Sequence, residues 1–151
     1  MMNLKIFLLL ITLLKVNYPN GHSTEDKILG KWIAAEDKNV IVSVYKESGE
    51  YRAKVLWFND SDDPNQPMNI RKDIHNPNET LRNQKVLGMD VLKNLKYNPE
   101  SNRWEGGLIY DPKTGREWSS VVSLQNDGEL KVKGYWHFEF LCKTMIFKKV
   151  E

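Results

Sequence analysis

Apolar and polar residues alternate with a period of two through most of the chain after residue 27, and this pattern predicts consecutive β-strands. We expect strands over residues 28–35, 40–45, 51–58, 103–110, 117–124, 129–138 and 141–150, with one or two more within residues 85–97. The clearest alternation puts one set of side chains on a single face, namely Leu130, Val132, Gly134, Trp136 and Phe138. Turn residues such as Asn126-Asp127-Gly128 separate the strands, because Asn and Gly tolerate positive φ.

About eight short antiparallel strands in one domain predict an all-β fold, either a small closed barrel or a sandwich. Closure would remove the exposed strand edges that invite aggregation. The interior of an eight-stranded barrel is filled by side chains or holds one small ligand. The chain carries no internal repeat and no sign of a second domain.

A long segment, residues 59–83, interrupts the strand pattern and predicts a loop. It contains three prolines and an acidic cluster of Asp60, Asp62 and Asp63. A loop of this length in a small β domain is uncommon and often functional. Within it, residues 78–84 suggest a short helical turn with Asn78 as its N-cap.

The first 23 residues have the pattern of a secretory signal peptide. Lys5 precedes an apolar run over residues 6–14, which is far shorter than the about 20 residues that a membrane span needs. The small residues Gly21 and Ser23 suggest cleavage before Thr24. The alternative is a buried N-terminal element of the domain. We therefore expect an exported chain, periplasmic or secreted, whose mature domain covers residues 24–151 and has no membrane span.

The charge and the cysteine content of the chain exclude several classes of function and site. The chain has 22 Lys+Arg and 20 Asp+Glu, and the surplus belongs to Lys5 and Lys15, so the mature domain is close to neutral. It lacks the basic surface that nucleic-acid binding requires. The single cysteine, Cys142, excludes an intramolecular disulfide and a cysteine-rich zinc site. We expect it to be a buried, inert thiol, with intermolecular pairing as the alternative.

Several sequence blocks resemble a known family. Gly30-Lys31-Trp32 resembles the first strand of lipocalin-like (calycin) barrels, in which the Trp plugs one end. Residues 73–77 (Asp-Ile-His-Asn-Pro) and 104–115 (Trp-Glu-Gly-Gly-Leu-Ile-Tyr-Asp-Pro-Lys-Thr-Gly) resemble the DUF2147 family of secreted bacterial proteins. The resemblance implies export and a lipocalin-like, antiparallel up-and-down β-barrel of about eight strands. It brings no established biochemical activity, and no cofactor.

The chain departs from the family pattern near its C-terminus. The family usually has Gly at the position of Cys142, Trp at that of Phe147 and Arg at that of Lys149. The replacement of Gly by Cys142 puts in doubt a close approach of the backbone at this position, whereas the other two replacements are conservative.

The Tyr110-Asp111-Pro112-x-x-Gly115 block has two interpretations. As a turn, Asp111 accepts from backbone N–H groups two residues on, Pro112 presets φ and Gly115 takes the positive-φ position. As a binding site, Tyr110 and Asp111 lie at a barrel mouth and hold a polar ligand group.

The polar cluster on the long loop also has two interpretations. Asp73 and Asn76 pin the loop, or they contact a ligand together with Trp57, Tyr110 and Asp111 near the barrel mouth. Aromatic walls suit a small molecule, and they also stack on sugars, so a glycan ligand stays open. A metal site is not expected, because too few additional ligands accompany the histidines.

Our leading hypothesis is therefore an exported, non-enzymatic barrel that binds a small molecule or a component of the cell envelope. One alternative is a hydrolase acting on envelope material through Asp73, His75 and Asp111, with His75 as the base. Another is a protein-interaction module that uses strand edges and the acidic loop. The sequence does not determine the oligomeric state.

Overall fold

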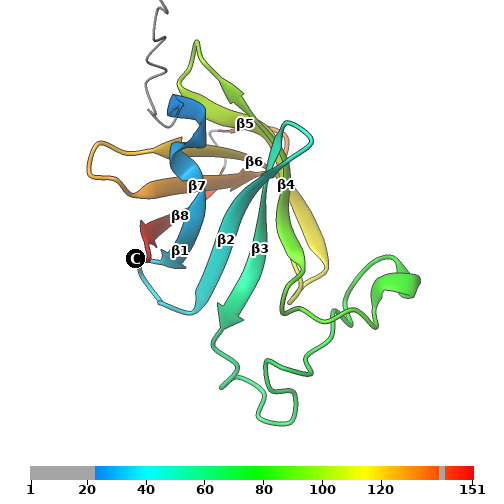
Figure 1. The fold of residues 1–151 in the computed structure, drawn as a ribbon. Helices are drawn as coiled ribbons and strands as arrows, with labels where there is room; N and C mark the ends of the chain where they lie inside the picture. The colour runs from blue at the N-terminus through cyan, green and yellow to red at the C-terminus, as the bar shows by residue number, and fades with distance from the viewer. Residues whose placement is uncertain (1–22, 140–141) are drawn as a thin grey trace, which may run out of the picture.

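The computed structural model, which describes residues 23–139 and 142–151, is a closed antiparallel barrel of eight strands (Figure 1). Each strand pairs with the next along the chain, and β8 returns to pair with β1. The prediction of an all-β, up-and-down barrel is confirmed, and the alternative of a sandwich is excluded. The residues predicted as a signal peptide, apart from Ser23, lie outside the described part of the chain.

The elements follow the sequence pattern closely. They are η1 (Thr24–Ile28), β1 (Gly30–Ala34), β2 (Val40–Glu47), β3 (Glu50–Phe58), η2 (Glu79–Leu81), β4 (Asp90–Asn98), β5 (Arg103–Asp111), β6 (Arg116–Leu124), β7 (Leu130–Tyr135) and β8 (Cys142–Lys149). The two η elements are single 3-10 turns. Among the described residues, no helix is both long and apolar enough to cross a membrane.

Two strand predictions differ from the structure at their ends. The residues before Gly30 form η1 rather than the start of β1. β7 stops at Tyr135 instead of continuing to Phe138. The Phe138 N–H donates to the Trp136 carbonyl at 2.9 Å across His137, whose φ is +67°. This tight turn ends β7 and leaves the side chains of Trp136 and Phe138 exposed. The alternating pattern placed them on the same face as Leu130 and Val132, but only the latter two are buried.

One end of the barrel is closed by η1 and Trp32. The Trp32 indole N–H donates to the Ile28 carbonyl at 2.8 Å, and the Trp104 indole N–H donates to the Glu25 carbonyl at 3.0 Å. Lys149 places its ammonium group 5.5 Å from the centre of the Trp32 ring, a cation–π contact. Both indoles are almost wholly buried. The 3-10 turn that follows the expected cleavage point is thus an integral part of the barrel end.

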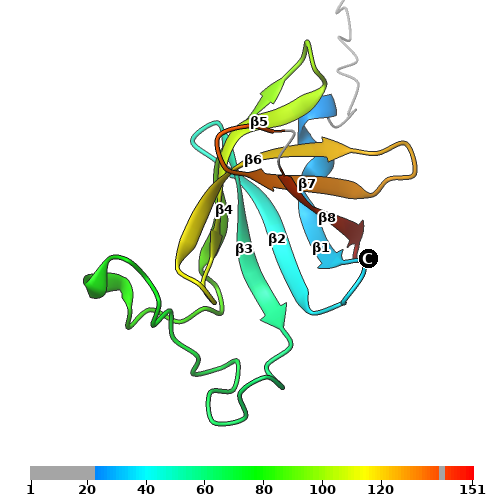
Figure 2. The ribbon, with the colours of Figure 1, turned by 180° about the vertical axis from the view of Figure 1, so that it is seen from behind.

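The long loop between β3 and β4 projects from the opposite end of the barrel, as Figures 1 and 2 show from two sides. Lys72 and Lys85 form an isolated antiparallel bridge within it. η2 begins after Asn78, whose side-chain oxygen accepts from the Thr80 N–H at 3.1 Å, as expected for an N-cap. The short helical turn expected here is confirmed. Cys142 at the start of β8 is only partly buried, contrary to prediction.

Candidate functional site

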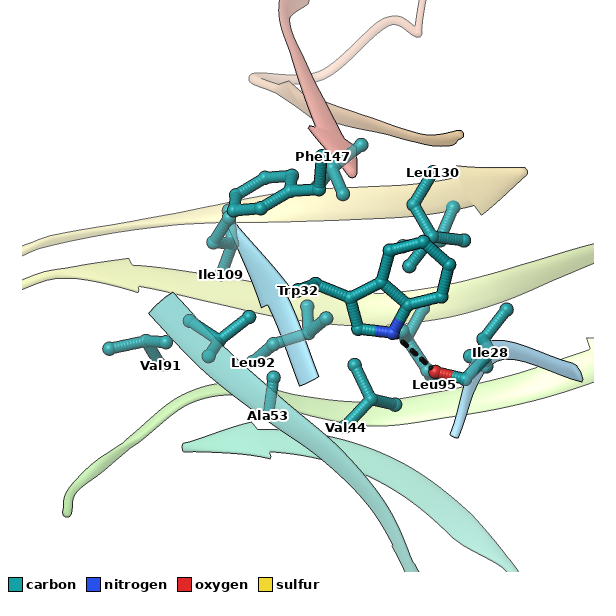
Figure 3. Close-up of a pocket in the computed structure, with 13 residues that line it drawn as sticks. Ile28, Trp32, Val44, Ala53, Val91, Leu92, Leu95, Ile109, Leu130 and Phe147 are labelled. Carbon is teal, nitrogen blue, oxygen red and sulfur yellow. Dashed lines mark hydrogen bonds between the residues drawn. The ribbon is translucent and has the colours of Figure 1, made fainter. Parts of the chain in front are cut away.

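The barrel interior, as formed by the described residues, contains a space with a uniformly apolar wall. A cavity of about 50 Å³ extends from Ile28 and Trp32 at the closed end toward Val91, Ile109 and Phe147 (Figure 3). Its thirteen lining residues are all hydrophobic, and no polar atom is exposed to it. For comparison, an apolar cavity of ~150 Å³ stays dry and admits benzene, and pockets for drug-sized ligands span roughly 300–1,000 Å³. The interior is therefore largely packed, with room for a small apolar group.

Asp73 is the centre of a hydrogen-bonded cluster that joins the loop to the outer wall of the barrel. Its side chain is fully buried. Asp73 Oδ1 accepts from the Tyr110 hydroxyl at 2.7 Å, and Oδ2 accepts from Asn76 Nδ2 at 2.7 Å and Gln84 Nε2 at 3.3 Å. Burial, followed by the hydrogen bond to Asp73, raises the pKa of Tyr110 above its ordinary value. The phenol therefore stays protonated and acts as a donor. We call Asp73, Asn76, Gln84 and Tyr110 the loop clasp.

The turn after β5 forms the second half of this attachment. Asp111 Oδ1 accepts from the Lys113 N–H at 2.9 Å, and its Oδ2 accepts from the Thr114 hydroxyl at 2.9 Å. The turn ends at Gly115, whose φ is +69°. A Cβ on Gly115 would overlap the carbonyl oxygen of His75. The backbone of the loop therefore packs directly against the turn, and only a glycine allows this approach.

Arg71 organises the acidic part of the loop. Its guanidinium donates to Asp62 Oδ1 at 2.7 Å and to the carbonyl oxygens of Asp60, Asp63 and Gln66 at 2.7–3.1 Å. Asp62 Oδ2 also forms an ion pair with Lys113 at 3.1 Å, which ties the loop to the turn after β5. The acidic cluster is thus engaged within the protein rather than presented to a partner.

We predict that this ion-pair network titrates at unusually low pH. The hydrogen bond from Arg71, followed by that from Lys113, lowers the pKa of Asp62 from 3.8 to about 2. Because the pKa of Asp62 is lower in the folded state, the ionised carboxylate stabilises the folded loop at pH values above the pKa that Asp62 has in the unfolded chain. This contribution to stability is lost as the pH falls from about 4 to about 2. An NMR titration of the Asp62 carboxyl should give a pKa of about 2. Replacing Lys113 by Met should raise it, and a midpoint near 3.8 in the wild type would contradict the prediction.

The structure brings together some, but not all, of the residues that the sequence analysis proposed as ligand contacts. Asp73, Asn76 and Tyr110 share one cluster, and Asp111 lies beside it in the turn. Trp57 is separate: it pairs with Ile41, which alternates with core residues and so faces outward. Trp57 is 37% exposed. Contact of these side chains with a ligand stays a prediction.

The residues of the hydrolase alternative are not arranged for acid–base chemistry. Asp73 directs its oxygens to Tyr110, Asn76 and Gln84, and Asp111 is engaged in its turn. His75 is exposed, and within the described residues its ring is hydrogen-bonded to neither carboxylate. The described part of the chain also contains no cluster of three or more His, Cys, Asp or Glu able to hold a metal ion.

Sequence reasoning did not find several residues that shape the site. Gln84 and Arg71 hold the loop, and Ala53 and Leu95 line the cavity. Ser120 is fully buried on β6 among apolar neighbours. A signal for Ser120 was available, because it occupies an inward position between Trp118 and Val122. The roles of Gln84 and Arg71 depend on loop geometry that no local pattern encodes.

The fold and interior define a class of protein. An eight-stranded up-and-down barrel, closed at one end by a Gly-x-Trp strand and a 3-10 turn, is a lipocalin-like barrel. The solved structure of protein HP1028 from the human pathogen Helicobacter pylori, described as belonging to the lipocalin family, matches with a TM-score of 0.68. The two share 22% sequence identity, and the match covers 82% of this chain and 83% of that one.

Residues 30–149 match the family model DUF2147, described as an uncharacterized protein conserved in bacteria. The chain belongs to this family. No curated protein matches the sequence significantly.

Proposed function

We propose that this protein is an exported, non-enzymatic binding protein that takes up a small, largely apolar molecule inside its barrel. The observation that carries the proposal is the cavity, whose thirteen lining side chains are all hydrophobic. An apolar space in an otherwise closely packed interior favours apolar ligand groups. The signal-like pattern of residues 1–23 supports export.

The same wall argues against a glycan in the interior. Sugar hydroxyl groups need hydrogen-bond partners when they are buried, and the cavity exposes no polar atom. The indole N–H groups of Trp32 and Trp104 are already bonded to backbone carbonyls. The interaction-module alternative gains no support either, since β1 and β8 close the barrel and the acidic loop residues are bonded internally.

A pair of variants on one strand tests the proposal. Ala53 on β3 lines the cavity, whereas the next residue, Lys54, is exposed on the outer face. We expect Ala53→Leu to occupy the cavity and to weaken binding of xenon, a small apolar probe, at least tenfold, and Ala53→Val to give a smaller loss. Lys54→Leu should leave the affinity unchanged. NMR titration of the cavity methyl groups measures binding, and circular dichroism checks the fold of each variant.

Two results would overturn the proposal. One is the absence of any xenon-induced shift in the cavity methyl groups of the wild type. The other is an equal affinity of the wild type and a folded Ala53→Leu variant. Native mass spectrometry of protein purified from its own host compartment then identifies the natural ligand as a co-purifying mass.

A further inference from the structure

The outer wall of the barrel carries an open concavity beside the connection from β7 to β8. Its volume is about 540 Å³, within the range of roughly 300–1,000 Å³ that is typical of small-molecule sites. On β7, Lys133 and Tyr135 alternate with the buried Val132, so their side chains face outward, away from the apolar cavity. We call this concavity the outer pocket, and it is lined by Lys133, Tyr135, His137, Phe138 and Glu139.

Ion pairs from two strands hold the rim of the outer pocket and balance its charge. Glu139 Oε1 lies 2.8 Å from the guanidinium of Arg103 and 3.6 Å from Lys133 Nζ. Arg103 is at the start of β5, and β6 lies between β5 and β7, so the contact reaches across β6. Arg103 also pairs with Glu105 at 3.0 Å. Two cations and two carboxylates are thus paired here, and this group carries no net charge.

The outer pocket contains hydrogen-bonding groups that the described part of the chain does not use. The Trp136 indole N–H donates to His137 Nε2 at 2.8 Å, so a neutral imidazole carries its proton on Nδ1. Neither this Nδ1–H nor the Tyr135 hydroxyl is hydrogen-bonded to another described residue. Both can donate to a ligand, and the hydroxyl and the Glu139 carboxylate can also accept.

Aromatic side chains supply an apolar surface beside these polar groups. Phe138, which lines the outer pocket, is 59% exposed, and so is Trp136. The centre of the His137 ring lies 5.9 Å from that of Trp136 and 6.5 Å from that of Phe138. Neighbouring exposed aromatic rings are typical of interaction sites rather than of ordinary surface.

We propose that the outer pocket binds a neutral sugar, with Phe138 against an apolar face of the sugar ring and Tyr135 and His137 hydrogen-bonded to its hydroxyl groups. A sugar combines a C–H face with hydroxyl groups that both donate and accept, which matches an aromatic surface beside unused donors and acceptors. A charged ligand is disfavoured because the charges of the pocket are already paired. A wholly apolar ligand would cover these polar groups without replacing their hydrogen bonds to water. The site is separate from the barrel cavity and does not depend on the proposed function.

An NMR titration that follows the His137 ring and the indole N–H beside it tests the proposal. The neutral probes are methyl glucoside, methyl galactoside and N-acetylglucosamine, the charged probes are glucuronate and glucosamine, and cyclohexanol is a ring with a single hydroxyl. We expect at least one neutral sugar to bind more tightly than the charged probes and cyclohexanol. Phe138→Ala and Tyr135→Phe should each weaken its binding about fivefold. Ile74→Ala, at an exposed apolar position of the long loop, is the matched control, and Ala53→Leu in the cavity should also leave sugar binding unchanged.

Glu139→Gln separates a binding role from a structural one. The substitution removes the carboxylate that pairs with Lys133, so the outer pocket gains a net positive charge. The affinity for glucuronate relative to that for the neutral sugar should therefore rise about fivefold. Circular dichroism checks the fold of each variant. The proposal is overturned if no neutral sugar shifts the signals of the wild type, if cyclohexanol binds as tightly as the sugars, or if a folded Glu139→Gln variant keeps the wild-type selectivity.

Discussion

Replacing Gly115 by alanine should lower the free energy of unfolding by about 3 kcal/mol and release the long loop from the barrel. Two effects add at this position. A non-glycine residue in the left-handed region costs about 1–2 kcal/mol, and Gly115 has a φ of +69°. The new Cβ would also overlap the His75 carbonyl oxygen and lie 2.9 Å from its carbonyl carbon. Because the obstacle is backbone on both sides, rotating a side chain cannot relieve it.

A second glycine provides the control for backbone strain. Gly128 in the hairpin between β6 and β7 has a φ of +86°, and a Cβ there would have no neighbour within 4 Å. Gly128→Ala should therefore cost only the about 1–2 kcal/mol of the conformation itself. Urea denaturation gives the two free energies, and hydrogen exchange of the Asp73 and Val86 amides reports on release of the loop. Equal costs for the two variants would show that the contact between Gly115 and His75 is not maintained in solution.

Replacing Asp73 by alanine should have an effect of comparable size, a loss of about 3 kcal/mol. The carboxylate is fully buried and accepts from Tyr110, Asn76 and Gln84. Without it, these donors stay buried and unsatisfied, and each unsatisfied group costs about 1–3 kcal/mol unless the loop opens to water. Tyr110→Phe removes one donor and should cost about 1–2 kcal/mol. The double variant should be less destabilised than the sum of the two single variants, because the two residues contact each other directly.

An exposed aspartate provides the comparison for Asp73. Asp127 accepts from the Glu129 N–H at 3.0 Å in the exposed hairpin between β6 and β7. Its replacement by alanine should cost less than about 1 kcal/mol, because water replaces the lost acceptor. If Asp73→Ala proves no more costly than Asp127→Ala, the loop clasp contributes little to stability. The resemblance of the loop and the turn to the family pattern would then need an explanation other than their contribution to stability.

Most of the barrel was predictable because strands and turns are encoded locally. Alternation identified seven strands, and the hairpin turns lie where Asn, Asp and Gly gather. Alternation alone does not reveal which way a side chain faces where one extra residue changes the geometry. The β-bulge between Ile41 and Val42 shifts the register of β3, so Trp57 faces outward although Tyr51, Ala53 and Val55 before it are buried. A period of two cannot reveal such a shift.

The candidate site was less predictable, because its contacts join distant parts of the chain. Asp73 and Tyr110 are 37 residues apart, and the sequence left open whether they pin a loop or bind a ligand. The buried position of Ser120 between two glycines depends on three strands aligning in register. Neither arrangement has a local signature.

The sequence by itself determined where the strands and the long loop lie, since propensity, alternation and turn chemistry act over a few neighbouring residues, and the resemblance of its sequence blocks indicated the family. Only the tertiary structure decided how the loop is held, which side chains line the cavity and which buried group lacks a partner. These features follow from barrel closure, which brings strands together in a register set by bulges and packing. The apolar cavity, on which the proposed function rests, therefore emerges only in the folded molecule.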